Sequence, residues 1–208
     1  MAEGFFITFE GIEGSGKSTQ IQLLKEYLEQ KGLDVLLTRE PGGTKIGRKI
    51  RRLLLDPENE NMDYKTEILL YAADRAQHVK EMIKPALAEG KVVISDRFID
   101  SNLAYQAVGR GLDYERVYQI NSWVIDSCWP DLTFILDIDI KEGLKRARSL
   151  SEDQIGDRLE REVDSFHQRV RKAYLEMAAQ ERFVLVNASR EKDEVQKEIQ
   201  NIISGRLL

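Results

Sequence analysis

The sequence predicts an α/β fold in which a parallel β-sheet is covered by helices on both faces. Two observations support this: strand-like segments alternate with segments of helical periodicity, and each strand-like segment is an unbroken apolar run. Strands of a parallel sheet have this composition because the crossover helices bury both faces. No repeat, linker or low-complexity tract divides the 208 residues, so we expect one domain spanning residues 1–208.

Five apolar runs are the predicted strands, each bounded by polar or turn-forming residues. They are FFITF (5–9), VLLT (35–38), KVVISDR (91–97), the run at 132–136 and RFVLVNA (182–188). Helical spacing predicts a helix with Ile21, Leu24 and Leu28 on one face and Gly32 as its end. Further helices are predicted at 46–55, 66–87 (bent or ended by Pro85), 114–126, 141–148, 160–180 and 192–203, with a polar interruption at 149–157.

Composition limits the classes of function. A net charge of −5 argues against a general nucleic-acid binder, because non-specific duplex binding needs a broad cationic face. Cys128 is the only cysteine, which excludes an intrachain disulfide and fits a reducing compartment. No apolar stretch approaches membrane-spanning length, and the N-terminus does not resemble an export signal. We therefore expect a cytoplasmic protein with no membrane or nucleic-acid partner.

A glycine-rich loop follows the first predicted strand. The segment FEGIEGSGKST (9–19) fits the pattern G-x-x-x-x-G-K-[ST]. The glycines let backbone N–H groups converge on phosphate oxygens, Lys17 can reach the terminal phosphates and the Ser18 hydroxyl can ligate Mg²⁺. A chance glycine turn is the alternative, but the strand before the loop and the helix after it favour a nucleotide site. The predicted contacts are Gly11, Ile12, Glu13, Gly14, Ser15, Gly16, Lys17, Ser18 and Thr19.

Asp96 is the candidate partner of Ser18 at a metal site. It comes immediately after the apolar run VVIS, and parallel strands deliver the residues at their carboxyl ends to the ligand crevice. A helix N-cap or an ion pair with Arg97 would also explain Asp96. We favour ligation of Mg²⁺, directly or through water.

Arginines indicate a second anion site. Arg97 follows Asp96 directly, where its guanidinium could hold another phosphate in a bidentate manner. Tyr71 and Arg75 are four residues apart and share one helix face, so they could stack on a base and donate a hydrogen bond to it. From these residues alone, a core Tyr71 and a surface ion pair at Arg75 form the simpler interpretation.

Five motifs together resemble bacterial thymidylate kinases. FEGIEGSGKST, TREPGGT, LLYAADRAQH, SDRFIDSNLAYQ and the later KRAR and DRLE occur in the order and spacing of that family, over essentially the whole chain. The resemblance implies a P-loop nucleoside-monophosphate-kinase fold with a parallel five-stranded sheet and a short lid. It also implies a homodimeric cytoplasmic enzyme that transfers the γ-phosphoryl group of ATP to dTMP, giving dTDP, with Mg²⁺ as cofactor.

The resemblance assigns roles at the acceptor end of the site. Tyr71 is similar to the aromatic residue on which thymine stacks, Arg75 to the donor to a base carbonyl, and Arg97 to the ligand of the dTMP phosphate. Tyr105 resembles the ring that crowds the 2′ side of the sugar and disfavours ribose. The further substrate-binding residues that it implies are Arg39, Glu40, Pro41, Arg51, Ser101, Asn102 and Gln106.

Glu13 is an unexpected residue in a phosphate-binding loop, because a desolvated and unpaired carboxylate among phosphates is strongly unfavourable. It must face a hydrogen-bond donor, and a sugar hydroxyl is the obvious one. The resemblance agrees, since an acid at this position is similar to one that accepts a hydrogen bond from the 3′-OH of dTMP. A solvated loop glutamate is the alternative.

The phosphate-binding loop lacks an arginine. Some thymidylate kinases carry a catalytic arginine there, where Gly14 stands in this chain. The positive charge must then come from elsewhere, and the polar segment 148–161 fits a lid that closes over ATP. Arg158 in DRLE matches the lid arginine of the bacterial type, and Arg146 and Arg148 flank the entry of the lid as further ATP contacts.

The lid departs from the family pattern. Related lids often read R-A-R-x-R-G, whereas this one reads RARSLSEDQIG, so it stays open which of Arg148, Arg158 and Arg161 is catalytic. The alternative for all three is ion pairing on the helix surface, worth about 0.2–0.5 kcal/mol per pair. The candidate partners are Glu160, Glu162 and Asp157.

The implied chemistry is electrostatic. The acceptor phosphate has a second pKa of about 6 and is mostly dianionic at neutral pH, so no general base is required. Lys17, Arg97, Arg158 and Glu13 form the predicted catalytic set, while His78 and His167 are expected on helix surfaces without a catalytic role. The rival functions are a kinase for another nucleotide acceptor and a nucleotide-dependent switch. A second phosphate pocket argues against the switch.

Overall fold

The computed structural model describes residues 4–150, 158–159 and 161–207; of residues 148 and 150 it describes the backbone only. Five strands form one sheet in the order β2-β3-β1-β4-β5, and all four neighbouring pairs are parallel. The strands are β1 (Phe5–Glu10), β2 (Val35–Arg39), β3 (Val92–Asp96), β4 (Leu132–Asp137) and β5 (Phe183–Asn187). The predicted sheet and its five strands are confirmed.

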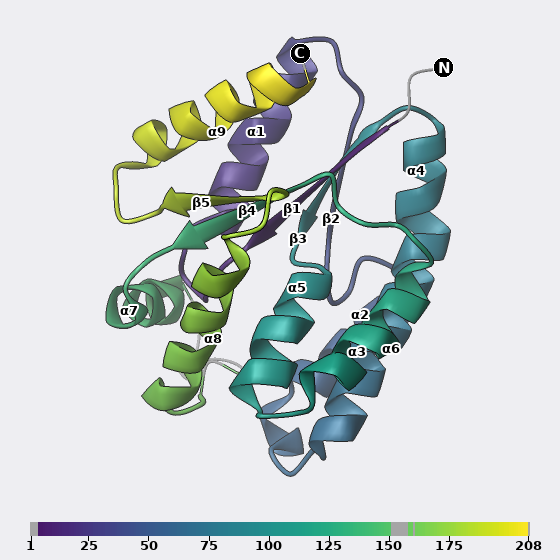
Figure 1. Cartoon of the computed structure of the whole chain (residues 1–208), viewed down its shortest axis with the longest axis vertical. Helices are drawn as coiled ribbons and strands as arrows, with labels where there is room; N and C mark the ends of the chain where they lie inside the picture. The colour runs from purple at the N-terminus through teal and green to yellow at the C-terminus, as the bar shows by residue number, and fades with distance from the viewer. Residues whose placement is uncertain (1–3, 151–157, 160, 208) are drawn as a thin grey trace.

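Helices connect the strands (Figure 1). In chain order they are α1 (Lys17–Gln30), α2 (Lys45–Leu55), α3 (Tyr64–His78), α4 (Lys84–Ala88), α5 (Ile99–Asn102), α6 (Tyr114–Ile125), α7 (Ile140–Leu150), α8 (Asp164–Met177) and α9 (Lys192–Leu207). A 3₁₀ turn covers Pro57–Asn59, and π-helical segments cover Val79–Ile83 and Leu103–Gly109. Among the described residues, no helix is long and apolar enough to cross a membrane.

Pro85 does not end the helix predicted at 66–87. The chain continues from α3 through the π-helical segment Val79–Ile83 into α4, which reaches Ala88. Pro85 lies in the first turn of α4, directly after the π turn has changed the backbone pairing. At this position the missing N–H of proline costs little, because the first turn of a helix leaves its N–H groups unpaired.

Several element boundaries differ from the sequence prediction, and one helical segment was missed. Helix α8 begins at Asp164 rather than at residue 160, because Val163 has extended backbone angles. Helix α7 continues to Leu150, two residues into the predicted polar interruption. The helical segment from Ile99 to Gly109 was not predicted, although Leu103, Ala104 and Ala107 recur at helical spacing and are buried.

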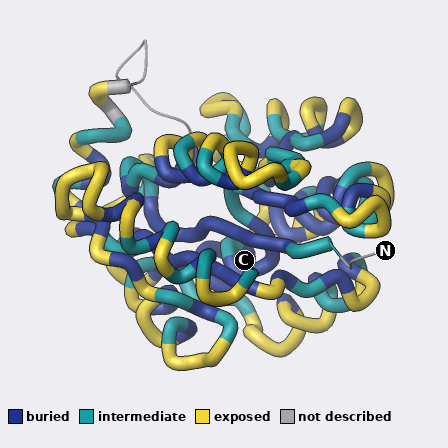
Figure 2. Tube along the Cα trace, turned by 90° about the horizontal axis from the view of Figure 1, so that it is seen from above, coloured by how far each residue is buried: buried dark blue, intermediate teal, exposed yellow. Residues whose placement is uncertain are grey.

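The strands form a buried layer between helices, as the dark tube in Figure 2 shows. Alternate side chains of β1 and β3 enter different apolar clusters. Ile7 and Ile94 belong to the main core, while Phe6 and Val93 pack in a smaller cluster with Ile83. Both faces of the sheet are therefore covered, as the unbroken apolar runs predicted, and the carboxyl ends of the strands are left to form a site.

Candidate active site

A cavity of about 710 Å³ opens at the carboxyl ends of β1 and β3. Phe9 and Asp96 are register partners, so the loop that follows β1 and the residues that follow β3 must meet here. The predicted residues that line the cavity are Glu13, Gly14, Gly16, Lys17, Ser18, Thr19, Arg39, Glu40, Pro41, Arg51, Tyr71, Arg75, Asp96, Arg97, Ser101, Asn102, Tyr105, Gln106 and Arg146.

The remaining predicted residues lie elsewhere. Ile12 and Ser15 are buried beneath the loop, and Gly11 supplies a carbonyl that accepts hydrogen bonds from Lys17 and Arg97. The side chain of Arg148 lies outside the described residues. Leu55, Phe98, Ala147, Ser149 and Leu159 line the cavity without having been predicted.

Lys17 at the start of α1 is folded back onto the loop. Its Nζ donates to the carbonyl oxygens of Gly11 at 3.1 Å and Ile12 at 2.9 Å, and its side chain is almost fully buried. Burial and the nearby Arg97 charge lower the pKa of Lys17 to about 8, although neighbouring carboxylates oppose them. The loop thus holds a cation whose acceptors are neutral carbonyls, which a phosphate oxygen would replace favourably.

For the kinase activity that the sequence resemblance implies, the lowered pKa of Lys17 predicts a pH dependence of ATP capture. Above pH 8 the free enzyme loses the ammonium charge, so kcat/KM for ATP should fall by roughly tenfold per pH unit. Under saturating ATP, kcat/KM for dTMP should stay flat, because the arginines remain charged. Initial rates between pH 6.5 and 9.5 measure both constants. A flat profile for ATP up to pH 9.5 would contradict the role of Lys17.

Gly14 explains why the loop carries no arginine. Its φ is +70°, and a Cβ added there would lie 1.9 Å from the carbonyl oxygen of Gly143 in α7. Any side chain at residue 14 is therefore excluded twice, by backbone conformation and by the close approach of α7.

We expect Gly14→Ala to lower the free energy of unfolding by about 2 kcal/mol or more and to raise the KM for ATP, because the loop must move away from α7. Thermal melting and steady-state kinetics measure the two effects. Gly205→Ala is the matched control, since an added Cβ there meets nothing within 4 Å in helix α9. Equal melting temperatures for the two variants would contradict the steric argument.

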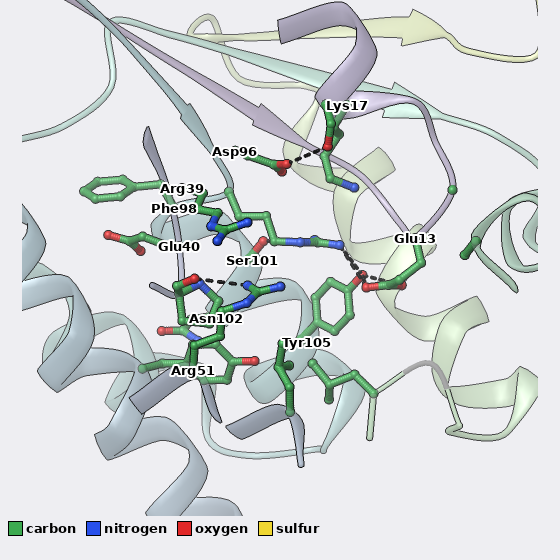
Figure 3. Close-up of a pocket in the computed structure, with 18 of the residues that line it drawn as sticks. Glu13, Lys17, Arg39, Glu40, Arg51, Asp96, Phe98, Ser101, Asn102 and Tyr105 are labelled. Atoms are coloured by element: carbon green, nitrogen blue, oxygen red, sulfur yellow. Dashed lines mark hydrogen bonds and ion pairs between the residues drawn. The ribbon is translucent and has the colours of Figure 1, made fainter. Parts of the chain in front are cut away.

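Ser18 and Asp96 face each other beside the phosphate-binding loop. The Ser18 hydroxyl donates to Asp96 Oδ2 at 3.2 Å (Figure 3). A hydroxyl and a carboxylate oxygen at this separation are the hard oxygen ligands that Mg²⁺ binds in nucleotide sites. The donor set therefore fits the metal that the motif suggested, and among the described residues Asp96 forms no ion pair with Arg97.

Glu13 and Arg97 both line the cavity and form an ion pair there. Arg97 Nη2 donates to Glu13 Oε1 at 2.8 Å, and the Tyr105 hydroxyl donates to both oxygens of Glu13 at 2.8 Å. Burial raises the pKa of Glu13, but the charges of Arg97 and Lys17 outweigh it, so the pKa lies below its usual value. The alternative of a solvated loop glutamate is wrong.

Arg97 is held by a shell that the sequence did not reveal. Its Nη1 donates to Ser101 Oγ at 3.2 Å and to the Tyr174 hydroxyl at 3.4 Å. Both hydroxyls donate in turn to Glu10 Oε2, at 2.6 and 2.8 Å. Burial, together with the charge of Asp100, raises the pKa of Glu10 to about 7. A backbone with φ of +69° at Arg97 then directs this guanidinium toward the cavity rather than along a strand.

Arg75 lines the cavity beside Glu40 and Asn102. Its Nε donates to Glu40 Oε2 at 2.8 Å, Nη1 donates to Asn102 Oδ1 at 2.6 Å and to Asn121, and Nη2 donates to the Phe98 carbonyl at 3.0 Å. Only 1% of the residue is exposed. The alternative of a surface ion pair is therefore wrong, and a base carbonyl that binds Arg75 must share or replace one of these acceptors.

The two histidines are not on helix surfaces. His78 is fully buried, with Nδ1 at 2.8 Å from Glu40 Oε1 and Nε2 on the Thr38 hydroxyl. His167 is also fully buried, with Nδ1 at 3.9 Å from Glu13 Oε2. Helical spacing did not reveal this, because α3 and α8 are covered on more than one side.

Arg158 does not line the cavity. Its guanidinium donates to Glu67 in α3 and, through Nε at 2.8 Å, to the Leu54 carbonyl, while its backbone N–H donates to the Leu55 carbonyl. The ion-pair partners considered from the sequence were Glu160, Glu162 and Asp157. Of these, Glu162 pairs with Arg110 instead, and residues 151–157 and 160 of the predicted lid lie outside the described residues.

Comparisons with known proteins agree with these features. A family model described as thymidylate kinase matches residues 9–199. The chain is similar to thymidylate kinase of Halothermothrix orenii, with 60% identity over 205 residues and 99% of each chain covered. It is 50% identical over 208 residues to the enzyme of Lactobacillus acidophilus, covering 99% of this chain and 96% of the relative.

A solved structure agrees as well. The crystal structure of thymidylate kinase from Ehrlichia chaffeensis matches with a TM-score of 0.77 and 36% identity, covering 97% of this chain and 99% of that one. Sequence and fold thus lead to one conclusion. The chain belongs to the thymidylate kinase family, nucleoside monophosphate kinases that phosphorylate dTMP to dTDP at the expense of ATP.

Proposed function

We propose that ATP and dTMP bind at opposite ends of this cavity and that Arg97 lies where their phosphates meet. The observation that supports the proposal is the position of Arg97 beside Glu13 of the phosphate-binding loop, with Tyr71, Arg75 and Asn102 lining the same cavity. A nucleotide switch needs one phosphate site, whereas this cavity carries cations suited to two.

The acceptor roles follow from the lining side chains. Tyr71 would stack on thymine, and Arg75 and Asn102 would contact its polar edge. Glu13 would accept a hydrogen bond from the 3′-OH, and the Tyr105 ring would crowd the 2′ position. Ser101, Gln106 and Arg51 complete the wall, and Arg39, Glu40 and Pro41 form the loop near the acceptor phosphate.

Mg²⁺ would be held by Ser18 and Asp96, directly or through water. When bound with ATP, the ion neutralises phosphate charge and orients the phosphoryl group. Lys17 and the N–H groups of the loop bind the donor phosphates, with Thr19 beside them and Arg146 at the lid entry.

Phosphoryl transfer would then depend on positioning rather than on a base. The acceptor phosphate is already mostly dianionic, so the residues must hold two polyanions in line and screen their repulsion. Lys17 serves the donor, Arg97 serves the acceptor, and a lid arginine serves the group in transfer. We propose Arg158 for that last role, within a lid at about 148–161 of a single domain spanning 1–208.

A coupled assay of ADP release with ATP and Mg²⁺ tests the proposal. Turnover with dTMP should exceed turnover with dCMP, dGMP or AMP by about a hundredfold or more, because a base edge left unpaired in a polar pocket is strongly disfavoured. ATP hydrolysis without an acceptor should be negligible. Comparable turnover of another monophosphate would favour the rival acceptor, and acceptor-independent hydrolysis would favour the switch.

We propose that the enzyme acts in the cytoplasm as a homodimer. Helices α2, α3 and α6 gather on one flank (Figure 1), and they carry the exposed apolar residues Leu53, Leu69 and Trp123. Trp123 is 81% exposed and Leu69 57%. Ala72, Val79 and Ile83 of the same helical region are core residues, so the core explains them but not Leu69. We propose that a second copy of the chain packs against these exposed apolar residues.

Light scattering on the eluting protein tests the dimer. Leu69→Glu and Trp123→Glu should convert it to a monomer, because a carboxylate buried against apolar surface is costly. Leu185→Glu is the matched control, since Leu185 is 44% exposed on strand β5, away from this flank. A wild-type protein that elutes as a monomer at micromolar concentration would contradict the proposal.

A further inference from the structure

A chain of side-chain amides runs behind the acceptor end of the cavity. Arg75 Nη1 donates to Asn102 Oδ1 at 2.6 Å, and Asn102 Nδ2 donates to Gln106 Oε1 at 2.7 Å. Gln106 Nε2 donates to Glu67 Oε1 at 2.8 Å. All four side chains are fully or almost fully buried. This series of hydrogen bonds therefore joins Arg75, at the cavity wall, to the Glu67 carboxylate, which does not line the cavity.

Glu67 is a fully buried anion with several donors. Arg110 contacts both of its oxygens at 3.3 Å, and Arg158 contacts Oε2. Burial raises the pKa of Glu67, but the charges of Arg110 and Arg158 outweigh it, so the pKa lies below its usual value. Glu67 is therefore a carboxylate that only accepts hydrogen bonds.

The charged ends fix the direction of every hydrogen bond between them. An amide can present either its oxygen or its nitrogen after a half-turn about its last bond, and packing alone hardly distinguishes the two. Arg75 only donates, so Asn102 must turn its oxygen to it. Glu67 only accepts, so Gln106 must turn its nitrogen to it. Turning either amide would set two acceptors or two donors against each other in a buried place.

We propose that Glu67 is a specificity-determining residue, which acts through Gln106 and Asn102 to set the hydrogen-bonding pattern of the base pocket. Each of these amides lines the cavity and keeps one N–H and one lone pair beyond those used in the chain. The proposal rests on the acceptor pocket assigned above. It gives a reason for an acid at Glu67, in a part of α3 remote from the reacting phosphates.

The pattern matters because thymine and cytosine have opposite polar edges. Thymine presents an accepting O4 beside a donating N3–H, whereas cytosine presents a donating amino group beside an accepting N3. Amides of fixed orientation can match one of these edges, and amides free to turn can match both. Glu67 thus restricts the enzyme to one edge without touching the base.

The test is the ratio of kcat/KM for dTMP to that for dCMP. In Glu67→Gln, Arg75 still fixes Asn102, but the residue at 67 can donate as well as accept, so turning Gln106 is opposed by Asn102 alone rather than by two neighbours. The ratio should therefore fall by about tenfold or more, mainly through a gain with dCMP. Glu162→Gln is the matched control, because Glu162 pairs with the same Arg110 but lies outside the amide chain. Its ratio should stay within twofold of wild type. An unchanged ratio in Glu67→Gln would overturn the proposal.

Two more variants separate the possible failures. Gln106→Met breaks the chain in the middle and leaves both arginines on Glu67, so it should lower the ratio as well. A change in Gln106→Met without one in Glu67→Gln overturns this inference alone; no change in either overturns the assigned pocket too. If Glu67→Gln does not fold, the charge-balanced pair Glu67→Gln with Arg110→Met is compared with Arg110→Met alone, and equal ratios overturn the proposal.

Discussion

Replacing Arg158 with alanine is expected to lower kcat by about a thousandfold or more. An arginine that stabilises charge on the transferring phosphoryl group is worth about 10³–10⁵ in rate, and the phosphate-binding loop supplies none because Gly14 excludes a side chain. The KM values should change much less, since the contact forms chiefly in the transition state. Steady-state kinetics at saturating ATP and dTMP measure the loss.

Arg158 is bound to other residues in this structure. Arg158 is held here by Glu67 and by the carbonyl of Leu54 at the end of α2, so it must leave both to act. Glu67 would then keep its ion pair with Arg110, and this lowers the free-energy cost of moving Arg158 away. If Arg158 serves only as an anchor, Arg158→Ala will lower the melting temperature and leave kcat within a few-fold. Arg161→Ala, at an exposed position, is the control.

Replacing Arg97 with alanine should reduce kcat/KM for dTMP by about 10²–10⁴-fold while changing the KM for ATP only slightly. Two proposed charge-assisted hydrogen bonds to the acceptor phosphate would be lost, each worth about 1.5–3 kcal/mol. The loss also removes the Arg97 ion pair from Glu13 and leaves the Tyr105 hydroxyl as a donor to both of its oxygens. Kinetics with each substrate varied in turn give both constants.

The control for Arg97 is Arg52→Ala, which removes an exposed arginine of α2 that does not line the cavity. Its constants should equal those of wild type. Arg97→Lys keeps the charge without the fork and should fall between alanine and wild type. If Arg97→Ala affected ATP and dTMP equally, the division of the cavity into donor and acceptor ends would be wrong.

The sheet could be predicted because each strand carries its own local signal. The runs of Phe5–Glu10 and Leu132–Asp137 are apolar enough to be buried on both faces, and that burial identifies parallel strands. The π-helical turn before Pro85 has no such signal. Val79 and Ile83, at its two ends, are both buried in the smaller apolar cluster, and their spacing of four residues is also that of an ordinary α-helix.

The cavity was predicted through motifs, and the network behind it was not. Glu13, Lys17 and Asp96 belong to short patterns that state their chemistry. Glu67 and Arg110 are 43 positions apart in the sequence, and no common pattern joins them. Glu10 could have been identified as a site residue from the sequence, because it ends an apolar strand as Asp96 does. Networks of this kind are fixed by tertiary packing, so they become visible only when the helices are in place.

The backbone contact between the phosphate-binding loop and α7 has an evolutionary consequence. A Cβ on Gly143 would lie 2.7 Å from the Glu13 carbonyl oxygen, and one on Gly14 would lie 1.9 Å from the Gly143 carbonyl oxygen, so the close approach of loop and helix requires glycine at both positions. An arginine could not enter the loop at residue 14 by one substitution, because the helix behind the loop would first have to withdraw. The exclusion of a side chain from the loop is thus set at residue 143 as much as at residue 14.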